Sequence, residues 1–260
     1  MCAIHTTASS SFGSAHQFVP LALHAFGPGW FERGSYSVYF RTPTCHLEPV
    51  QAFMRVPASA DHAQAEAWSE AIDGAHVIDG SLGMGAPDEP GALRQRLIES
   101  AGRPSAFRIL AGYHVGQALP EEERCFPLHP GPAVKGVPPR PGGEGQLMRR
   151  DDTTEPLDWY YGPSPWGGPI ASPLGLHRLL RPTASDGGLI GGIEVRMLHG
   201  PAFLDRDYVL STRIAGMDES PRTENLWCQS EIRDEAGTVV ASLLLMTRFV
   251  KQTSPLYAEP

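Results

Sequence analysis

Two six-residue stretches of the chain, VPLALH (19–24) and SPLGLH (172–177), are nearly identical and lie about 150 residues apart. Each follows an aromatic residue and a glycine, Phe12-Gly13 in one case and Trp166-Gly167 in the other. The proline and the histidine also occupy the same places in both stretches. The match therefore reaches beyond a few apolar letters, and it indicates that the chain contains the same unit twice.

Two more pairs of segments follow in the same order and at a nearly constant offset. The segment YSVYFRTP (36–43) matches GIEVRMLHGP (192–201). The segment AEAWSEAIDGAHVIDGSL (65–82) matches ENLWCQSEIRDEAGTVVASL (224–243). Both members of the last pair contain a tryptophan, then charged residues, then a turn signal and a second apolar run. We interpret this series of matched segments as an internal duplication.

The local signals predict one helix and several strands in each half. Proline is tolerated in the first turn of a helix, so Pro20 and Pro173 are expected to open short apolar helices. Apolar, β-branched stretches predict strands at 50–56, 207–216, 225–234 and 238–250. Asp73-Gly74 and Glu235-Ala236-Gly237 are turn signals of antiparallel hairpins. A helix packed on one face of an antiparallel sheet is an α+β arrangement.

A segment dense in proline and glycine, FPLHPGPAVKGVPPRPGGEG (126–145), is predicted to be a loop. Before it, the pattern predicts a capped helix over 88–100 and a strand over 108–123. We therefore expect an N-terminal unit at 1–102 and a C-terminal unit at 103–260, the latter containing the loop.

Charge and composition narrow the function classes. A formal net charge of -8 without a basic stripe argues against a nucleic-acid partner. No apolar run approaches the ~20 residues that a membrane span needs, and the N-terminus lacks the pattern of a secretory signal. The four cysteines are scattered without a CxxC pair, which favours reduced thiols and argues against a structural metal. These observations predict a cytoplasmic protein with no metal and no membrane partner.

Three phrases carry a family resemblance: VGQALP (115–120), EPLDW (155–159) and WGGPIASPL (166–174). They resemble the MaoC-like hydratases and dehydratases, which have a double hot-dog fold of two tandem units, each an antiparallel sheet wrapped around a central helix. The resemblance covers about residues 105–260 and reaches the N-terminal half through the repeat. It implies an acyl thioester of coenzyme A or a carrier protein as substrate, no separate cofactor, and a homodimer or a partner hot-dog subunit.

The resemblance also implies where the chemistry takes place. In the family, the N-terminus of the central helix faces the thioester oxygen, and an Asp and a His of the preceding loop handle the water. This chain departs from that motif. Asp158 stands where the family has its histidine, and the nearest counterpart of the family's aspartate is Asp152 or Thr153, displaced by a residue either way. Pro173 replaces a glycine whose N–H binds the oxygen, and proline has no N–H.

The candidate catalytic residues are accordingly Asp158, Tyr161, His177 and Asp152. Asp158 would serve as acid or base, or alternatively cap a turn in an aromatic-rich loop. His177 could replace the missing histidine, or it could be a structural residue that the repeat shares with His24. The candidate substrate-binding residues are Tyr160, Trp166, Gly167, Gly168, Ser172 and His24.

Three functions fit this sequence. The leading prediction is an enoyl-CoA hydratase or 3-hydroxyacyl dehydratase with an altered site. The second is an acyl-CoA thioesterase, because those hot-dog enzymes also pair two halves and often use a carboxylate to activate water. The third is a non-catalytic acyl-binding or partner subunit, which Pro20, Pro173 and the degraded Asp/His motif favour.

Overall fold

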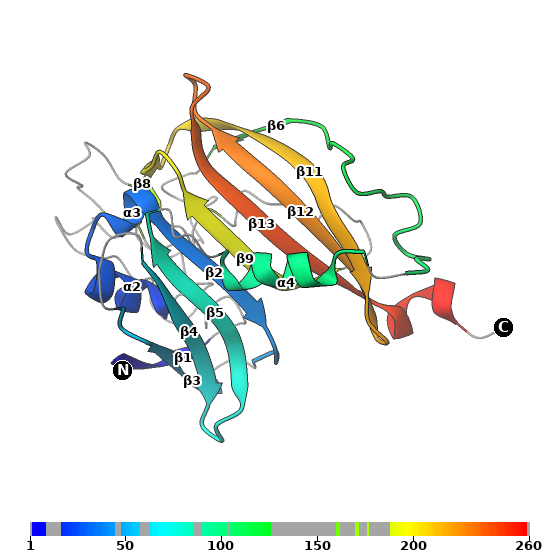
Figure 1. Cartoon of the computed structure of the whole chain (residues 1–260), viewed down its shortest axis with the longest axis horizontal. Helices are drawn as coiled ribbons and strands as arrows, with labels where there is room; N and C mark the ends of the chain where they lie inside the picture. Colours follow the sequence, from blue (N-terminus) through cyan, green and yellow to red (C-terminus); the bar gives the residue numbers. More distant parts are fainter. Residues whose placement is uncertain are drawn as a thin grey trace, which may run out of the picture.

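The computed structural model describes residues 2–8, 17–44, 48–57, 63–85, 90–102, 105–125, 160–161, 170–171, 176 and 188–258. Within them, one ten-stranded antiparallel sheet forms the body of the protein (Figure 1). Five of its strands come from the first part of the chain: β1 (Cys2–Ala8), β2 (Gly34–Phe40), β3 (Glu48–Met54), β4 (Gln64–Ala71) and β5 (His76–Met84). Five come from the later part: β6 (Glu122–Cys125), β9 (Leu189–Met197), β11 (Asp207–Glu219), β12 (Thr223–Arg233) and β13 (Val239–Val250).

The strand order runs β1-β3-β4-β5-β2-β9-β13-β12-β11-β6. Counted from the outer edge of the sheet to its centre, the strands of the first part follow the order β1, β3, β4, β5, β2, and those of the later part follow the order β6, β11, β12, β13, β9. The two parts therefore have the same strand order, because in each the second strand along the chain lies at the centre of the sheet. The segments that match in the sequence occupy equivalent places. Residues 36–40 lie in β2 and 192–197 in β9, and the hairpins β4–β5 and β12–β13 flank them.

The two parts meet where β2 pairs with β9, and we call this strand pair the seam. Ser37 lies opposite Glu194, Tyr36 opposite Val195 and Val38 opposite Ile193. Because side chains alternate between the faces of a strand, Tyr36 and Val38 point to one face and Ser37 to the other. We call these the inner face, which carries the large apolar cluster, and the outer face.

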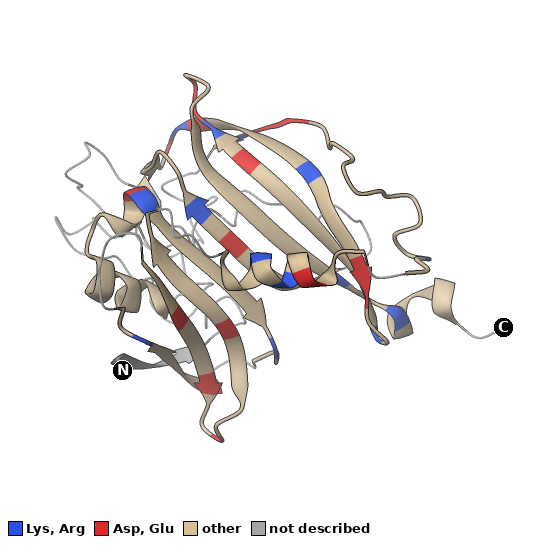
Figure 2. Cartoon of the chain, viewed as in Figure 1, with Lys and Arg blue, Asp and Glu red and all other residues tan. Residues whose placement is uncertain are grey.

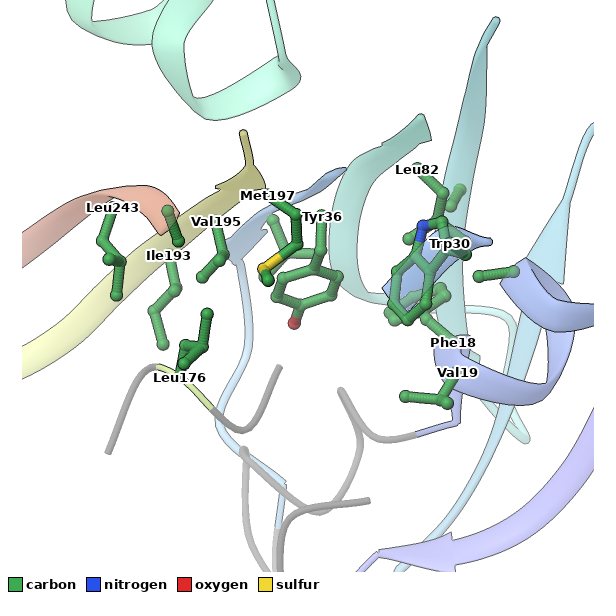
Figure 3. Packing of buried hydrophobic residues seen from close by; sticks show 14 of the residues in the cluster. Phe18, Val19, Trp30, Tyr36, Leu82, Leu176, Ile193, Val195, Met197 and Leu243 are labelled. Carbon is green, nitrogen blue, oxygen red and sulfur yellow. The ribbon is translucent and has the colours of Figure 1, made fainter. Parts of the chain in front are cut away.

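On the inner face, α2 (Phe18–Phe26) packs against β3 and β5, and three residues (27–29) connect it to α3 (Trp30–Arg33). The predicted apolar helix is confirmed, although it begins two residues before Pro20, which lies in the first turn where its missing N–H is tolerated. Small side chains on β3 and β4 (Ala52, Ala65, Ala67 and Ser69) are buried on this face. Phe18, Leu21 and Trp30 are completely buried in the same region (Figure 3).

On the outer face, α4 (Ala92–Ser100) crosses the seam, as Figure 1 shows. The predicted helix over 88–100 is confirmed in its last nine residues. Its own N-cap, Gly91, has no side chain to offer, and the strands cap the helix instead. The Ala92 N–H donates to Ser81 Oγ at 3.1 Å, and the Leu93 N–H donates to Ser37 Oγ at 2.8 Å.

A buried carboxylate lies under the start of α4. Glu194 is 1 % exposed; it accepts hydrogen bonds from Ser37 Oγ at 2.9 Å and from Arg94 Nε at 2.8 Å. Arg94 also donates to Gln229 Oε1 at 2.8 Å, which links the network to β12. A Cβ atom on Gly91 would lie 2.4 Å from the Glu194 carboxylate, so the close approach of α4 requires glycine at this position.

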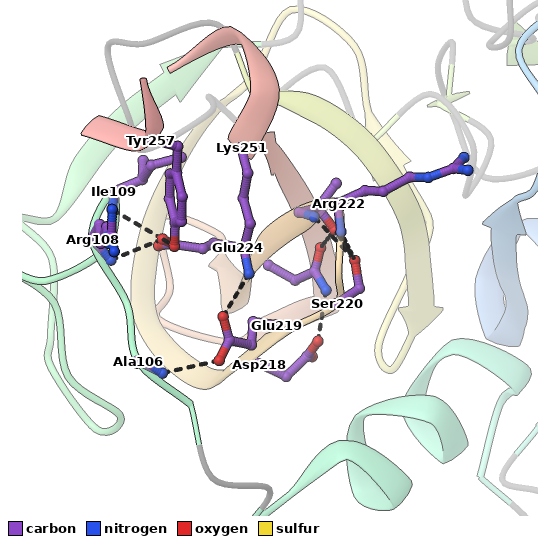
Figure 4. Close-up of polar contacts among 12 residues, drawn as sticks. Ala106, Arg108, Ile109, Asp218, Glu219, Ser220, Arg222, Glu224, Lys251 and Tyr257 are labelled. Atoms are coloured by element: carbon purple, nitrogen blue, oxygen red, sulfur yellow. Dashed lines mark hydrogen bonds and ion pairs between the residues drawn. The ribbon is translucent and has the colours of Figure 1, made fainter. Parts of the chain in front are cut away.

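The prediction of a strand over 108–123 is wrong. Residues 105–121 form turns along the edge of β11, with an isolated bridge between Ala118 and Arg213, and regular pairing begins only in β6. The cause is Glu224, a completely buried side chain of β12. Its carboxylate accepts the backbone N–H groups of 108, 109 and 110 at 2.8 to 3.1 Å and the Tyr257 hydroxyl at 2.6 Å (Figure 4). These bonds occupy the N–H groups that a strand would use.

The predicted hairpin turns are confirmed. Gly74 and Gly237 have positive φ angles of 81° and 80°, a conformation that glycine adopts without strain. Trp227 is buried and packs against α4 on the outer face, whereas Trp68 is half-buried and stacks on Phe53 with 5.3 Å between the ring centroids. Acidic and basic residues are spread over both parts of the described sheet (Figure 2). Among the described helices, none is long and apolar enough to cross a membrane.

Candidate functional site

The inner face contains buried polar atoms that lack hydrogen-bond partners. Within the described part of the chain these are both amide atoms of Gln17, the indole Nε1 of Trp30, the hydroxyl of Tyr36 and the hydroxyl of Ser69. Buried polar groups nearly always have a partner, and one left without any costs about 1–3 kcal/mol. Such atoms therefore indicate where a ligand or water can bind.

Tyr36 lies at the seam itself. Its side chain is 2 % exposed, and its ring lies 6.3 Å from the ring of Phe18, centroid to centroid, at the start of α2. In Figure 3 the hydroxyl points away from β2, between Leu176 on one side and Phe18 on the other. Burial raises the pKa of Tyr36 well above its ordinary value. The hydroxyl therefore stays protonated at every physiological pH and can donate a hydrogen bond.

Gln17 precedes α2 and occupies its N-cap position. It is 4 % exposed, its backbone is already helical, and its side chain makes no capping hydrogen bond. The first N–H groups of a helix have no partner within the helix and carry a partial positive charge. The start of α2 thus combines a carboxamide donor, a carboxamide acceptor and the helix dipole next to Phe18. Pro20 removes one N–H from this turn, as the sequence predicted.

The other side of the seam is apolar. Ile193 and Val195 of β9 face inward and belong to the same cluster as Leu176 and Leu243. In the view of Figure 3, Leu176 lies below Ile193. The inner face at the seam therefore offers hydrogen-bonding groups on the β2 side and hydrocarbon on the β9 side.

Most residues predicted from the sequence as site residues lie outside the described residues: Asp152, Asp158, Trp166, Gly167, Gly168, Ser172 and His177. Tyr160 and Tyr161 form β7 (Tyr160–Tyr161), which pairs with β8 (Ile170–Ala171), and β8 pairs in turn with β10 (Ala202–Phe203). The backbone of the two tyrosines is thus brought beside the segment that follows the double glycine. The histidine of the first repeat, His24, is exposed on α2, so its predicted binding role gains no support.

Sequence reasoning missed Gln17 and Tyr36. Both occur in ordinary contexts, one before an apolar helix and the other in an alternating strand. Alternation along 34–40 places Tyr36 on the same face as Val38, which would have assigned it to the core. What separates it from a core tyrosine is that its hydroxyl has no partner among the described residues, a property that depends on residues distant in the sequence.

Comparisons with known proteins show the fold. No family model and no curated protein matches the sequence. A putative oleoyl thioesterase from Lactobacillus plantarum is similar in structure, with a TM-score of 0.52, 9 % identity, and coverage of 95 % of this chain and 96 % of that one. A hot-dog protein of unknown function from Alicyclobacillus acidocaldarius matches at 0.48, with 15 % identity over 95 % and 93 % of the two chains.

A MaoC-like dehydratase from Rhodospirillum rubrum matches at a TM-score of 0.35, with 14 % identity, over 55 % of this chain and 97 % of that one. This similarity is too weak to support the finer resemblance to MaoC-like enzymes. The large antiparallel sheet and the full-length match to the putative oleoyl thioesterase establish that the chain has the hot-dog fold.

Proposed function

We propose that this protein hydrolyses acyl thioesters, with an acyl-coenzyme A or an acyl carrier protein as substrate. The observation that carries the proposal is the inner face of the sheet, where the Tyr36 hydroxyl at the seam and the Gln17 carboxamide at the start of α2 are buried without a partner among the described residues and accompany a large apolar cluster. An acyl thioester has the complementary chemistry, a polar carbonyl joined to a hydrocarbon chain. The similarity to the putative oleoyl thioesterase over the full length of the chain favours hydrolysis over the addition of water to a double bond.

We further propose that the chain is a double hot-dog protein that arose by duplication, with units at 1–102 and 103–260. The support is the repeated strand order on either side of the seam, together with the matched sequence segments. In this arrangement β2 and β9 make the contact that two separate hot-dog subunits would make in a dimer.

In the proposed reaction, water attacks the thioester carbonyl carbon, and a tetrahedral oxyanion forms. The C–S bond then breaks to give a carboxylic acid and a thiol, and the proton lost by the water goes to a base before it reaches the leaving sulfur. We propose Asp158 as that base, with Tyr161, His177 and Asp152 as further members of the site. No cofactor enters this chemistry.

The test is mass spectrometry of the protein incubated with saturated, 2-enoyl and 3-hydroxyacyl coenzyme A thioesters. We expect free coenzyme A to appear, and Asp158→Asn to abolish its release. Asp207→Asn, a change of the same kind at an exposed position of β11, is the control and should leave turnover unchanged. Full turnover by Asp158→Asn would refute the assignment of the base.

The other two functions predict different products. Gain or loss of water from the 2-enoyl or 3-hydroxyacyl thioesters would support the hydratase function that the phrase WGGPIASPL (166–174) favours. A panel that remains unchanged, with binding retained, would support the non-catalytic subunit that Pro20 and Pro173 favour. Either result would contradict hydrolysis.

A further inference from the structure

The register of the seam creates a local two-fold axis. In an antiparallel pair centred on Ser37 and Glu194, rotation about the centre exchanges β2 and β9. It brings Val38 onto Val195, and Tyr36 onto Ile193. The first of these pairs keeps the symmetry, since both residues are valine. The second breaks it, because a tyrosine hydroxyl on one side corresponds to a hydrocarbon side chain on the other.

Two groups supply unused hydrogen-bonding capacity, one on β2 and the other at the start of α2, which packs against β3 and β5 of the same part of the chain. The Tyr36 hydroxyl is buried and unpartnered among the described residues, and it points into the interior of the cluster (Figure 3). The Gln17 carboxamide, one residue before the phenyl ring that touches Tyr36, is equally buried and leaves both its donor and its acceptor unused. On the β9 side, Ile193 and Leu176 present only carbon.

We propose that the seam binds one ligand per chain in a single orientation, with a carbonyl oxygen at the Tyr36 hydroxyl, an amide group at Gln17 and the hydrocarbon chain on the Ile193 side. This inference rests on the proposed acyl-thioester substrate. A pantetheine thioester contains all three parts, since its carbonyl accepts, its amide N–H donates to Gln17 Oε1 and its amide oxygen accepts from Gln17 Nε2. Coenzyme A and carrier proteins both present pantetheine.

The test compares two ligands that cannot be hydrolysed. One is an S-(2-oxoalkyl) thioether of coenzyme A, which keeps a carbonyl; the other is the S-alkyl thioether of the same length, which has none. Isothermal calorimetry should show one site per chain for both. Tyr36→Phe should lower the affinity for the carbonyl ligand by about 5- to 10-fold, which corresponds to one neutral hydrogen bond, and leave the affinity for the S-alkyl ligand unchanged.

A matched control lies on the same strand. Tyr39→Phe removes a hydroxyl from the outer face, where Tyr39 stacks under Arg96, and should change neither affinity. Thermal unfolding provides the second readout. Because the Tyr36 hydroxyl has no partner to lose within the described structure, Tyr36→Phe should keep the melting temperature of the free protein or raise it by roughly 2–4 °C. Gln17→Met should weaken both ligands, since both retain the pantetheine amides.

The source of the pantetheine is settled by repeating the titration with the S-(2-oxoalkyl) thioether of pantetheine alone. Equal affinity for the pantetheine and coenzyme A thioethers would show that the protein recognises the pantetheine arm, which both carriers share. Tighter binding of the coenzyme A thioether would favour coenzyme A as the carrier. Two sites per chain, or equal loss of both ligands in Tyr36→Phe, would overturn the inference. Binding that depends on the carbonyl but is not accompanied by hydrolysis would support the inference and refute the proposed function. Hydrolysis that does not depend on Tyr36 would support the proposed function and refute the inference.

Discussion

Tyr36 and Ser37 are neighbours in the same strand, and each residue is only 2 % exposed, yet the hydrogen bonding of their hydroxyl groups differs. On the outer face, Ser37 Oγ accepts from the Leu93 N–H and donates to Glu194, so its capacity is used. On the inner face, the Tyr36 hydroxyl has no partner among the described residues. Burial alone therefore does not separate a structural polar group from one that is available to a ligand. The completeness of its hydrogen bonding does.

The strongest challenge to this comparison is the removal of the outer-face carboxylate. Glu194→Ala should lower the free energy of unfolding by about 3–5 kcal/mol, because Arg94 then has a partly buried charge without its partner. Urea unfolding of the variant and the wild type measures the difference. Glu194→Gln keeps an acceptor for Arg94, so the free energy of unfolding should fall by clearly less in this variant. A loss below 1 kcal/mol in Glu194→Ala would show that the network does not hold α4.

The second buried carboxylate, Glu224, extends the comparison to the far end of the sheet (Figure 4). Glu224→Ala should cost about 3 kcal/mol, because three backbone N–H groups and the Tyr257 hydroxyl lose their acceptor. Urea unfolding at neutral pH checks this value. Removal of only the Tyr257 hydroxyl, in Tyr257→Phe, is the milder control and should cost about 1 kcal/mol.

The same residue predicts a pH dependence. Burial by itself would raise the pKa of Glu224, but the hydrogen bonds from Tyr257 and the backbone outweigh it and hold the pKa below its ordinary value. A carboxyl group with a lowered pKa stabilises the fold above its unfolded pKa of about 4.3, and this contribution is lost as the pH falls through the folded value. Glu224→Gln should therefore show a flatter loss of stability below about pH 4 than the wild type. Parallel acid titrations would contradict this.

A pair of neighbouring substitutions sharpens the comparison directly. Ser37→Ala should cost about 2 kcal/mol, because the Leu93 N–H and Glu194 each lose a partner. Tyr36→Phe, one residue away, should cost nothing in the free protein. Urea midpoints of the two variants measured side by side give the answer, and equal losses would mean that the Tyr36 hydroxyl has a structural partner.

The smallest effect belongs to the outer surface. Arg41 forms an ion pair with Asp79, and the Arg41 side chain is 51 % exposed. Exposed pairs contribute little because water screens them, so Arg41→Ala should cost less than about 1 kcal/mol. Raising the salt concentration should shrink this difference further, and thermal unfolding at two salt concentrations measures it. A larger cost would show that exposure is a poor guide on this face.

Much of the fold could be predicted from the sequence because its signals are local. The hairpin turns at Gly74 and Gly237, the strands of the second half and the helix that includes Pro20 follow from periodicity and turn chemistry. The strand predicted over 108–123 failed because a single distant side chain, Glu224, takes the N–H groups of residues 108–110. Local pattern carries no information about such a contact.

The candidate site was less predictable. Motif resemblance directed attention to residues 152–177, of which the structure describes only short pieces, and those assignments remain predictions. Tyr36 and Gln17 stand out only when all neighbours are in place, because an unused hydrogen-bonding group is defined by what surrounds it. The segments that match in the sequence include β2 and β9, but the sequence predicted neither the pairing of these two strands nor the unused polar groups on the inner face.

The pairing of β2 with β9 also bears on how the chain is made. The ribosome completes β2 about 150 residues before β9 leaves it, which at 5–20 residues per second is a delay of roughly 8–30 s. During that interval β2 is paired with β5 on one side only, and its other edge is open next to an apolar inner face, the kind of edge that recruits a strand from another molecule. A nascent chain whose synthesis stalls after residue 102 should therefore associate with copies of itself through β2, at the place that β9 later fills.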